Sequence, residues 1–416
     1  MERGSTPDAP DPFDALAADV RRRWAKAGFG TDCFCEVASE ALDQAELHRL
    51  GKTALLNLAI ARIDRGAHRA CFHGADNVVP IFADDKFIMT FHLWRHTFGN
   101  PHSHEWNGAF QNLTDPVVYA DYAFETTWRL NHDLEIGRLT QERLSVLQPG
   151  AIVSVERDRS VHGFGHTGLP GLTVAVRSRD AYGHTYDYWG DALRVTNGAT
   201  DEVDEGATLR ARLLTNLRSV LEADFEVRLV ESVRAGGLRE NVLLALRLVE
   251  RDPQLHTEVF AAFMKTEPAA SVASSVEAAL VDKARHHQAL SMFEDASTPA
   301  ERFLVSLLRF APDGSRLRAL VAEHAAQLGI EPSGFSAALG QVARRSGARY
   351  LTGPERLRNI AFDVLESLLE GDAHERTVEK LGALYRIENI DDVVRNMMSW
   401  LASMPVFQSV LGEVRT

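Results

Sequence analysis

The amino-acid sequence predicts an α+β protein in which an antiparallel β-barrel lies between a helical N-terminal segment and an all-helical C-terminal part. Three observations predict this order: helical periodicity up to about residue 65, strand-like alternation up to about residue 197, and amphipathic helical repeats after about residue 208. A chain of 416 residues commonly forms two or three folding units. We therefore expect units over residues 1–67, 68–197 and 208–416.

The N-terminal segment has the apolar spacing of amphipathic helices. In "DALAADVRRRWAKAG", Leu16, Val20 and Trp24 recur at intervals of four and so share one helical face. Gly28 and Gly30 interrupt the pattern, and "ELHRLGKTALLNLAIARI" resumes it with apolar residues three and four apart. These features predict at least two helices before residue 65.

The middle of the chain changes to the period of a β-strand. In "DKFIMTFHLW", Phe87, Met89 and Phe91 alternate with Thr90 and His92, as on a strand that is buried on at least one side. Further strand-like segments follow, separated by Gly, Pro and Asn turns: "VVYADYAFETTW", "RLSVLQPGAIVSVE", "LTVAVRSR" and "HTYDYW". Short strands with such turns favour an antiparallel sandwich or barrel.

The C-terminal half follows the acidic run "NGATDEVDEGATLR", which we interpret as a solvated linker near residues 197–208. "STPAERFLVSLLRF" then carries the residues of a capping box, with Thr298 before the first turn and Glu301 inside it. "TGPERLRNIAFDVLESLLEG" repeats the arrangement with Thr352 and Glu355. The periodicity predicts a helical bundle, and an α-solenoid remains an alternative.

Composition and charge argue against several classes of protein. The formal net charge of −13 repels phosphate backbones and anionic lipids, so we expect no nucleic-acid partner and no membrane association. No apolar run approaches the ~18–20 residues of a membrane span, and the first residues lack the pattern of a secretory signal. The three cysteines form no disulfide framework. We therefore expect a cytoplasmic protein.

The segment "HTFGNPHSHEWNGAF" contains the clearest candidate for a metal site. His102 and His104 are two residues apart, and on an extended strand both imidazoles point to the same face. A third donor is expected from a neighbouring strand, and "SVHGFGHTGLPGL" offers His162 and His166. The sequence period does not decide between these two. Because the chain has sixteen histidines, chance clustering of polar loop residues is the alternative.

Three segments of the sequence resemble the cupins, and among the cupins they resemble the cysteine-dioxygenase-like thiol dioxygenases. "ADNVVPIFADDKFIMTFHLW" is similar to the strands before the family's first motif, and "NPHSHEWNGAF" resembles its His-x-His motif. "LSVLQPGAIVSVERDRSVHGFGHTGLPGLTVAVRSR" resembles the second motif, with one histidine before a hairpin. The resemblance extends from about residue 75 to about residue 180. It implies a cupin-type barrel with His102, His104 and His162 as ligands of a non-haem metal, iron(II) first.

The sequence also departs from that family. Gly108 and Ala109 occupy the positions where many cupins add a glutamate ligand, which favours an all-histidine site. Ala109 cannot form the Cys–Tyr crosslink of some thiol dioxygenases, Arg177 stands near their catalytic tyrosine, and Asp76 near their carboxylate-binding arginine. The resemblance therefore implies the metal scaffold more strongly than oxidation of cysteine itself.

Several other side chains are candidates for the same site. Tyrosines and an arginine on the predicted strands could donate protons or orient a substrate, and we single out as catalytic candidates Tyr119, Tyr122, Tyr186 and Arg177. Second-sphere or substrate contacts are expected from His166, Asp76 and His92, of which His92 is more typical of a hydrogen-bonded core histidine. His286 and His287 are adjacent on a predicted helix, so we expect a solvated face there.

Two functions follow as expectations. The first is an iron(II)-dependent dioxygenase or oxygenase that acts, with dioxygen, on a small polar metabolite that chelates the metal. Three imidazoles leave about three coordination positions for these molecules, although nickel, copper, manganese or zinc also suit the ligands. The second is a non-catalytic cupin sensor or scaffold whose helical part binds a protein partner or self-associates, because that part exceeds what a barrel requires as a lid.

Overall fold

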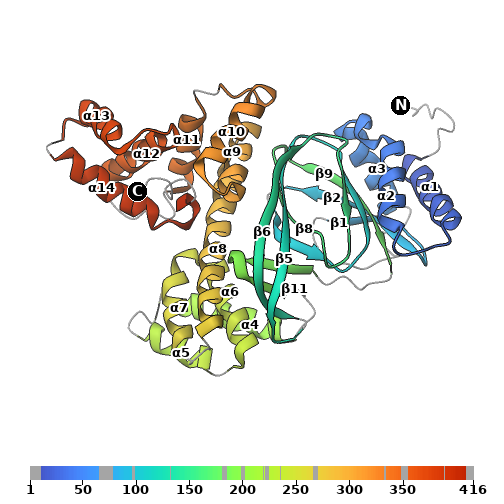
Figure 1. Ribbon diagram of the computed structural model, residues 1–416, viewed down its shortest axis with the longest axis horizontal. Coiled ribbons are helices and arrows are strands. Elements are labelled where there is room, and N and C mark those ends of the chain that lie inside the picture. Colours follow the sequence, from blue (N-terminus) through green and yellow to red (C-terminus); the bar gives the residue numbers. More distant parts are fainter. Residues whose placement is uncertain are drawn as a thin grey trace.

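The computed structural model describes residues 11–64, 78–95, 99–131, 133–179, 185–197, 202–218, 220, 224–234, 236–265, 270–331, 334–347, 355–387 and 389–408. Asp76, one of the predicted site residues, lies outside these ranges, as does Thr352 of the second predicted cap. The fold class is the predicted one, with N-terminal helices, a closed antiparallel barrel and C-terminal helices (Figure 1).

The N-terminal helices cover one face of a sheet. Leu16, Val20 and Trp24 are all buried, as their spacing predicted, and the Asp11 carboxylate caps the first helix by accepting the N–H of Phe13 at 2.9 Å. The helices are α1 (Pro12–Lys26), α2 (Phe34–Ala45) and α3 (Lys52–Asp64), with a 3₁₀ turn η1 (Leu47–Leu50).

The sheet beneath these helices has five antiparallel strands in the order β1-β2-β9-β4-β7. The predicted alternation is confirmed on the second strand, where Phe87, Met89 and Phe91 pack against the helices in one buried cluster. The strands are β1 (Val78–Ala83), β2 (Phe87–Trp94), β4 (Gly108–Asn112), β7 (Ile152–Val155) and β9 (Gly171–Ser178).

Six further strands close into the barrel, in the order β10-β11-β6-β5-β8-β3. The two longest strands curve through it and carry register shifts at Asp121/Tyr122 and Thr126/Trp128, which are bulges that bend the sheet. The strands are β3 (Gly99–His104), β5 (Val117–Arg129), β6 (Leu134–Leu147), β8 (Val161–His166), β10 (Thr185–Trp189) and β11 (Leu193–Asn197), with a 3₁₀ turn η3 (Gly190–Ala192) between the last two.

The rest of the described chain is helical. Its first helices are α4 (Glu202–Arg218), α5 (Phe225–Arg234), α6 (Leu238–Arg251), α7 (His256–Met264) and the long α8 (Ala270–Asp295). They continue as α9 (Pro299–Phe310), α10 (Gly314–His324), α11 (Phe335–Gly347), α12 (Glu355–Leu369), α13 (His374–Tyr385) and α14 (Ile390–Ala402). Short 3₁₀ turns are η4 (Pro253–Leu255), η5 (Ala325–Leu328) and η7 (Pro405–Phe407).

Two local predictions for this half have opposite outcomes. The capping box is confirmed: Thr298 Oγ1 accepts the N–H of Glu301 at 3.1 Å, and Glu301 accepts the N–H of Thr298 at 3.2 Å. The linker prediction is wrong from Glu202 onward, because that part of the acidic run begins α4. The helix forms because Ala207 and Ala211 face a buried apolar cluster, which local composition did not reveal.

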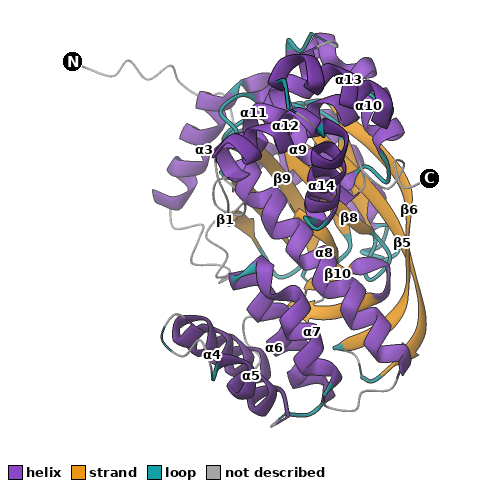
Figure 2. Cartoon of the chain, turned by 90° about the vertical axis from the view of Figure 1, so that its left-hand side faces the viewer, coloured by secondary structure: helices purple, strands orange, loops and turns teal. Residues whose placement is uncertain are grey.

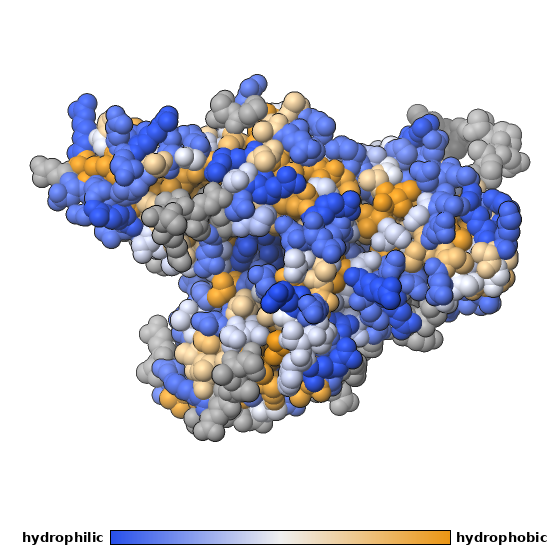
Figure 3. Space-filling model, in the orientation of Figure 1, coloured by the Kyte–Doolittle hydropathy of each residue, from blue (hydrophilic) through white to orange (hydrophobic). Residues whose placement is uncertain are grey.

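The C-terminal helices pack directly on barrel strands. One cluster joins Trp189 and Leu193 to α4–α8, and a second joins Val118 and Leu144 to α8–α14. In Figure 2, α8 crosses in front of β10, and the elements are in contact. Figure 3 shows apolar patches scattered among hydrophilic side chains on one face. No helix within the described ranges combines the length and apolarity of a membrane span.

Candidate metal centre

The three predicted histidines come together on two adjacent barrel strands. β3 pairs with β8 so that His102 lies opposite His162, and their ring centroids are 4.4 Å apart. The His104 ring lies 4.8 Å from that of His102 and 5.3 Å from that of His162. One ring nitrogen from each residue can be chosen so that all three lie within 4.8 Å of one another. This spacing allows all three to bind a single ion.

The continuous strand β8 separates the two candidates for the third position. His162 and His166 point to the same face, but four residues of strand place them about 13 Å apart. His166 instead stacks on Trp94, with ring centroids 5.8 Å apart and planes at 18°. The structure therefore brings His162, and not His166, to the His102–His104 pair.

Burial favours the neutral form of the three imidazoles. It lowers the pKa of His104 and His162 well below 6.5, and the charge of His102 acts in the same direction on both. Burial also lowers the pKa of His102, against opposing effects of the Asn100 carbonyl and of Asp187. Neutral imidazole is the form that binds a metal. The donor set therefore suits a divalent transition metal at neutral pH.

A hydrogen bond orients His102. Its ring Nδ1 donates to the carbonyl oxygen of Asn100 at 2.7 Å. Since Nδ1 carries the proton of that bond, Nε2 is left as the atom that can bind a metal. Asn100 belongs to the same strand as His102, so the "GNPHSH" segment supplies both a donor and its support.

Aromatic side chains surround the cluster. The ring of Tyr119 stacks over His162 at a centroid distance of 5.8 Å, and Trp106 stacks on His104 at 4.8 Å. Phe110 lies 5.6 Å from His162. Sequence reasoning selected Tyr119 but missed Trp106 and Phe110, although both follow the His-x-His motif closely. These rings limit the access of water to the histidines.

Tyr119 also borders a surface hollow of about 380 Å³. Burial raises the pKa of its hydroxyl, as does its hydrogen bond with Asp121. Asp121 accepts a hydrogen bond from Arg143 Nε at 2.8 Å, and both residues line the hollow. Tyr119 thus lies between this hollow and His162.

The other two tyrosine candidates are not brought to the histidines. Tyr186 lies opposite Ser103 in the β10–β3 pair, so it faces away from His102 and His104, and its hydroxyl donates to Glu105 at 2.6 Å. Tyr122 packs against the C-terminal helices, and Gln141 Nε2 donates to its hydroxyl at 3.3 Å. The strict alternation of strand residues accounts for the placement of Tyr186.

His92 and Arg177 approach the cluster from the five-stranded sheet. His92 Nε2 and Thr90 Oγ1 form a 2.9 Å hydrogen bond, which confirms the expectation of a hydrogen-bonded histidine. Burial lowers the pKa of His92 to about 3, and the nearby Arg177 acts in the same direction. The charge of Arg177 also lowers the pKa of His104. A cationic side chain therefore lies near His104.

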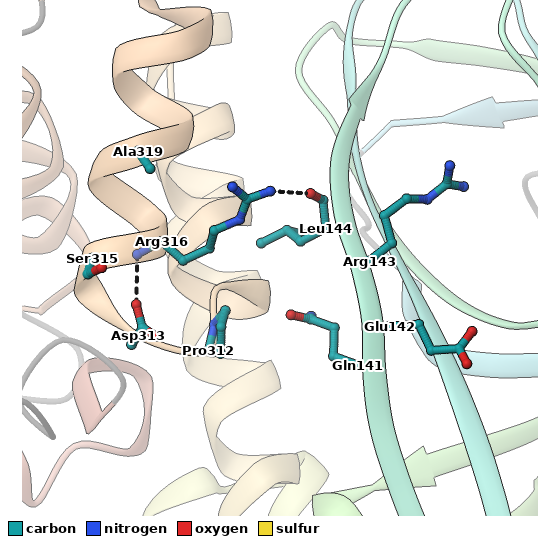
Figure 4. A pocket seen from close by; sticks show the side chains of 9 residues that line it. All are labelled: Gln141, Glu142, Arg143, Leu144, Pro312, Asp313, Ser315, Arg316 and Ala319. Carbon is teal, nitrogen blue, oxygen red and sulfur yellow. Dashed lines mark hydrogen bonds between the residues drawn. The ribbon is translucent and has the colours of Figure 1, made fainter.

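A second hollow, of about 530 Å³, lies between β6 and the start of α10. In Figure 4, Arg316 reaches from the helix to the Leu144 carbonyl, a hydrogen bond of 2.9 Å, while Glu142 and Arg143 point away from the helix. Gln141 points toward the helices and donates to the Phe310 carbonyl at 2.9 Å. None of the three histidines lines this hollow, which belongs to the junction between barrel and helices.

No family model matches the chain, and no curated protein matches it.

Proposed function

We propose that the chain is a metal-dependent oxygenase of the cupin type, with His102, His104 and His162 as ligands and iron(II) as the metal. The observation that supports this most strongly is the set of three imidazole nitrogens within 4.8 Å of one another on neighbouring strands of a closed antiparallel barrel. The resemblance of the His-x-His segment and of the later single histidine to cupin motifs supports the same assignment.

The chemistry of the donor set favours this class of ion. Three neutral imidazoles suit iron, zinc, copper or nickel, and they leave about three coordination positions for other molecules. No carboxylate belongs to the cluster, so a bound ion would keep its full charge and favour an anionic or chelating substrate. A bound iron(II) ion would supply the electron transfer to dioxygen that organic side chains do not provide.

The surrounding side chains have separate tasks in this proposal. Arg177 attracts an anionic group of the substrate to the side of His104. The Tyr119 hydroxyl keeps its proton at neutral pH and donates it in a hydrogen bond to Asp121, so its oxygen accepts a hydrogen bond from the bound substrate. The hollow beside Tyr119 is the entrance, and its volume of about 380 Å³ suits a small polar metabolite.

Metal analysis of protein purified without oxygen tests the proposal. We expect close to one equivalent of iron in the wild type and a loss of binding in His102→Ala, His104→Ala and His162→Ala. His256→Ala is the matched control, because this histidine of α7 is outside the cluster. A variant that combines all three alanine substitutions is also measured. If it contained as much iron as the wild type, the proposed site would be refuted.

Turnover distinguishes an oxygenase from the second candidate, a ligand sensor or scaffold. The direct packing of the C-terminal helices on β10 favours that candidate, because it connects the strand beside β3 to a large helical surface. An oxygen electrode with iron-loaded protein and a panel of small chelating acids decides between them. Substrate-dependent oxygen uptake supports the oxygenase, whereas a ligand that raises Tm and is never consumed supports the sensor.

A further inference from the structure

Asp187 is a buried carboxylate beside one of the three histidines. It lies directly opposite His102 where β10 pairs with β3, so both side chains point to the same face of the sheet. The Asp187 residue is only 8% exposed. Burial raises its pKa, while Lys283, Asn100 and His102 oppose that effect. Asp187 therefore lies within electrostatic reach of both His102 and a lysine from the helical half.

Lys283 of α8 is the partner from the helical half. Its side chain is 7% exposed, and its Nζ lies 4.2 Å from the centroid of the Trp189 ring and 3.2 Å from Glu250 Oε2. Trp189 is two residues beyond Asp187 on β10, so the two side chains share one face of that strand. Lys283 therefore lies over the face of β10 that carries Asp187.

The end of β10 is held tightly against α8. Gly190 donates its N–H to Asp282 Oδ2 at 3.2 Å, and Arg309 Nη1 lies 3.0 Å from Asp282 Oδ1. Gly190 has a φ of +48°, and a Cβ at this position would lie 2.4 Å from the backbone carbon of Ala278. This close approach leaves little freedom for α8 to shift relative to β10.

We propose that Asp187 and Lys283 form a link through which the C-terminal helices position His102 and set the metal affinity of the site. This inference rests on the proposed metal site and names its regulation. The buried carboxylate accepts a hydrogen bond from the side chain of Asn100, the residue whose carbonyl orients His102, and the charge of the Lys283 ammonium stabilises that carboxylate. Without the Lys283 ammonium, the Asp187 carboxylate loses its main compensating charge. We expect the carboxylate then to change its position relative to Asn100 and His102.

The link predicts reciprocal coupling between metal and helices. If the position of α8 affects metal affinity, metal binding must stabilise the packing of α8 on β10 by the same free energy. A perturbation of the helical half, for example by a protein partner, would then change metal occupancy without touching the histidines. This gives the helical half a role in either of the proposed functions.

Metal affinity and ligand-field spectra test the link directly. Apo protein is titrated with Co²⁺ against a chromophoric chelator, and the visible spectrum of the bound ion is recorded for wild type, Asp187→Asn, Lys283→Met and Lys283→Arg. We expect Asp187→Asn and Lys283→Met to weaken binding by about 10- to 100-fold and to shift the Co²⁺ bands, as loss of a group supporting a ligand commonly does. Lys283→Arg restores most of the affinity. Lys380→Met, which removes a paired lysine from α13, is the control without effect.

Hydrogen exchange gives a second measurement that requires no substitution of Asp187 or Lys283. We expect Zn²⁺ to slow amide exchange in α8 of the wild type but not in His162→Ala. Wild-type affinity and spectrum in Asp187→Asn, which is close to isosteric, would overturn the link even if Lys283→Met failed to fold. A wild-type protein that binds neither Co²⁺ nor Zn²⁺ would instead refute the proposed metal site itself.

Discussion

The N-terminal and C-terminal helices contact the strands through different kinds of interface. α1–α3 cover their sheet with an apolar cluster that includes Phe13, Phe34 and Phe91, and an ion pair between Lys52 and Asp115 accompanies it. The C-terminal helices also bury apolar residues, but they add charged groups at the end of β10. Burying charge is costly unless it is compensated, whereas burying apolar surface is favourable by itself.

This difference suggests different roles for the two helical regions. An apolar cover stabilises the fold without specifying one charge arrangement. The interface at β10 places Lys283, Asp282 and Arg309 near a strand that adjoins β3, the strand of His102 and His104. Such an interface is sensitive to small displacements, because the compensation of buried charges depends on short distances. We therefore expect damage to the first interface to change stability alone, and damage to the second to change the metal site as well.

The largest expected effect on stability separates the two roles. Phe13→Ala removes a fully buried ring from the N-terminal cover and should lower the free energy of unfolding by about 3–5 kcal/mol. Urea denaturation measures this loss, and a Co²⁺ titration of the folded variant should give wild-type affinity. Weakened metal binding in Phe13→Ala would contradict the difference between the two interfaces, because the N-terminal helices would then also affect metal affinity.

A smaller loss of stability is expected at the second interface. Gly190→Ala combines an unfavourable positive φ with a clash against the backbone of α8, and we expect a loss of about 2–3 kcal/mol. Gly206→Ala is the matched control, because a Cβ there meets nothing within 4 Å and alanine favours the helix. Urea midpoints and Co²⁺ affinity are measured for both variants. Only Gly190→Ala should weaken metal binding, and a wild-type affinity in that variant would contradict the coupling.

Acid should destabilise the apo protein through histidines that lie between the sheets. Burial lowers the pKa of His92 and of His166 to about 3. The unfolded chain, with histidine pKa values near 6.5, binds more protons below that pH, so stability falls as the pH drops from about 6.5 toward 3. The slope is about 1.4 kcal/mol per pH unit for each histidine. Urea unfolding at several pH values should show a shallower slope in His166→Phe, and an unchanged slope would contradict the assignment.

The smallest expected effect concerns the face of β10 that points away from the histidines. Tyr186→Phe removes the hydroxyl that donates to Glu105, at a cost of about 1 kcal/mol in unfolding free energy. Metal affinity should not change, because Tyr186 faces away from the histidines. Tyr119→Phe is the informative partner: it should bind metal normally but lower oxygen uptake by about 10-fold or more. Equal activity of the two variants would remove Tyr119 from the proposed mechanism.

Local patterns predicted the elements whose stability depends on nearby residues. The apolar face of α1, the alternation of β2 and the Thr298–Glu301 cap are all formed by side chains within a few positions of one another. The linker prediction failed at α4 because that helix depends on distant packing partners. The solvated-face prediction failed for His286, which is buried with its ring 5.5 Å from that of Trp189.

By itself, the sequence determined the α+β class, the order of the helical and strand regions, and the pair His102 and His104 on one strand face. These properties follow from short-range periodicity, which depends on backbone geometry alone. Only the tertiary structure decided that His162 rather than His166 joins that pair, that Tyr186 faces away from it, and that Lys283 lies over the strand of Asp187. These outcomes depend on strand register and on contacts between distant segments. A shift of one residue in register would reverse the direction of every side chain on a strand, and no local pattern specifies it.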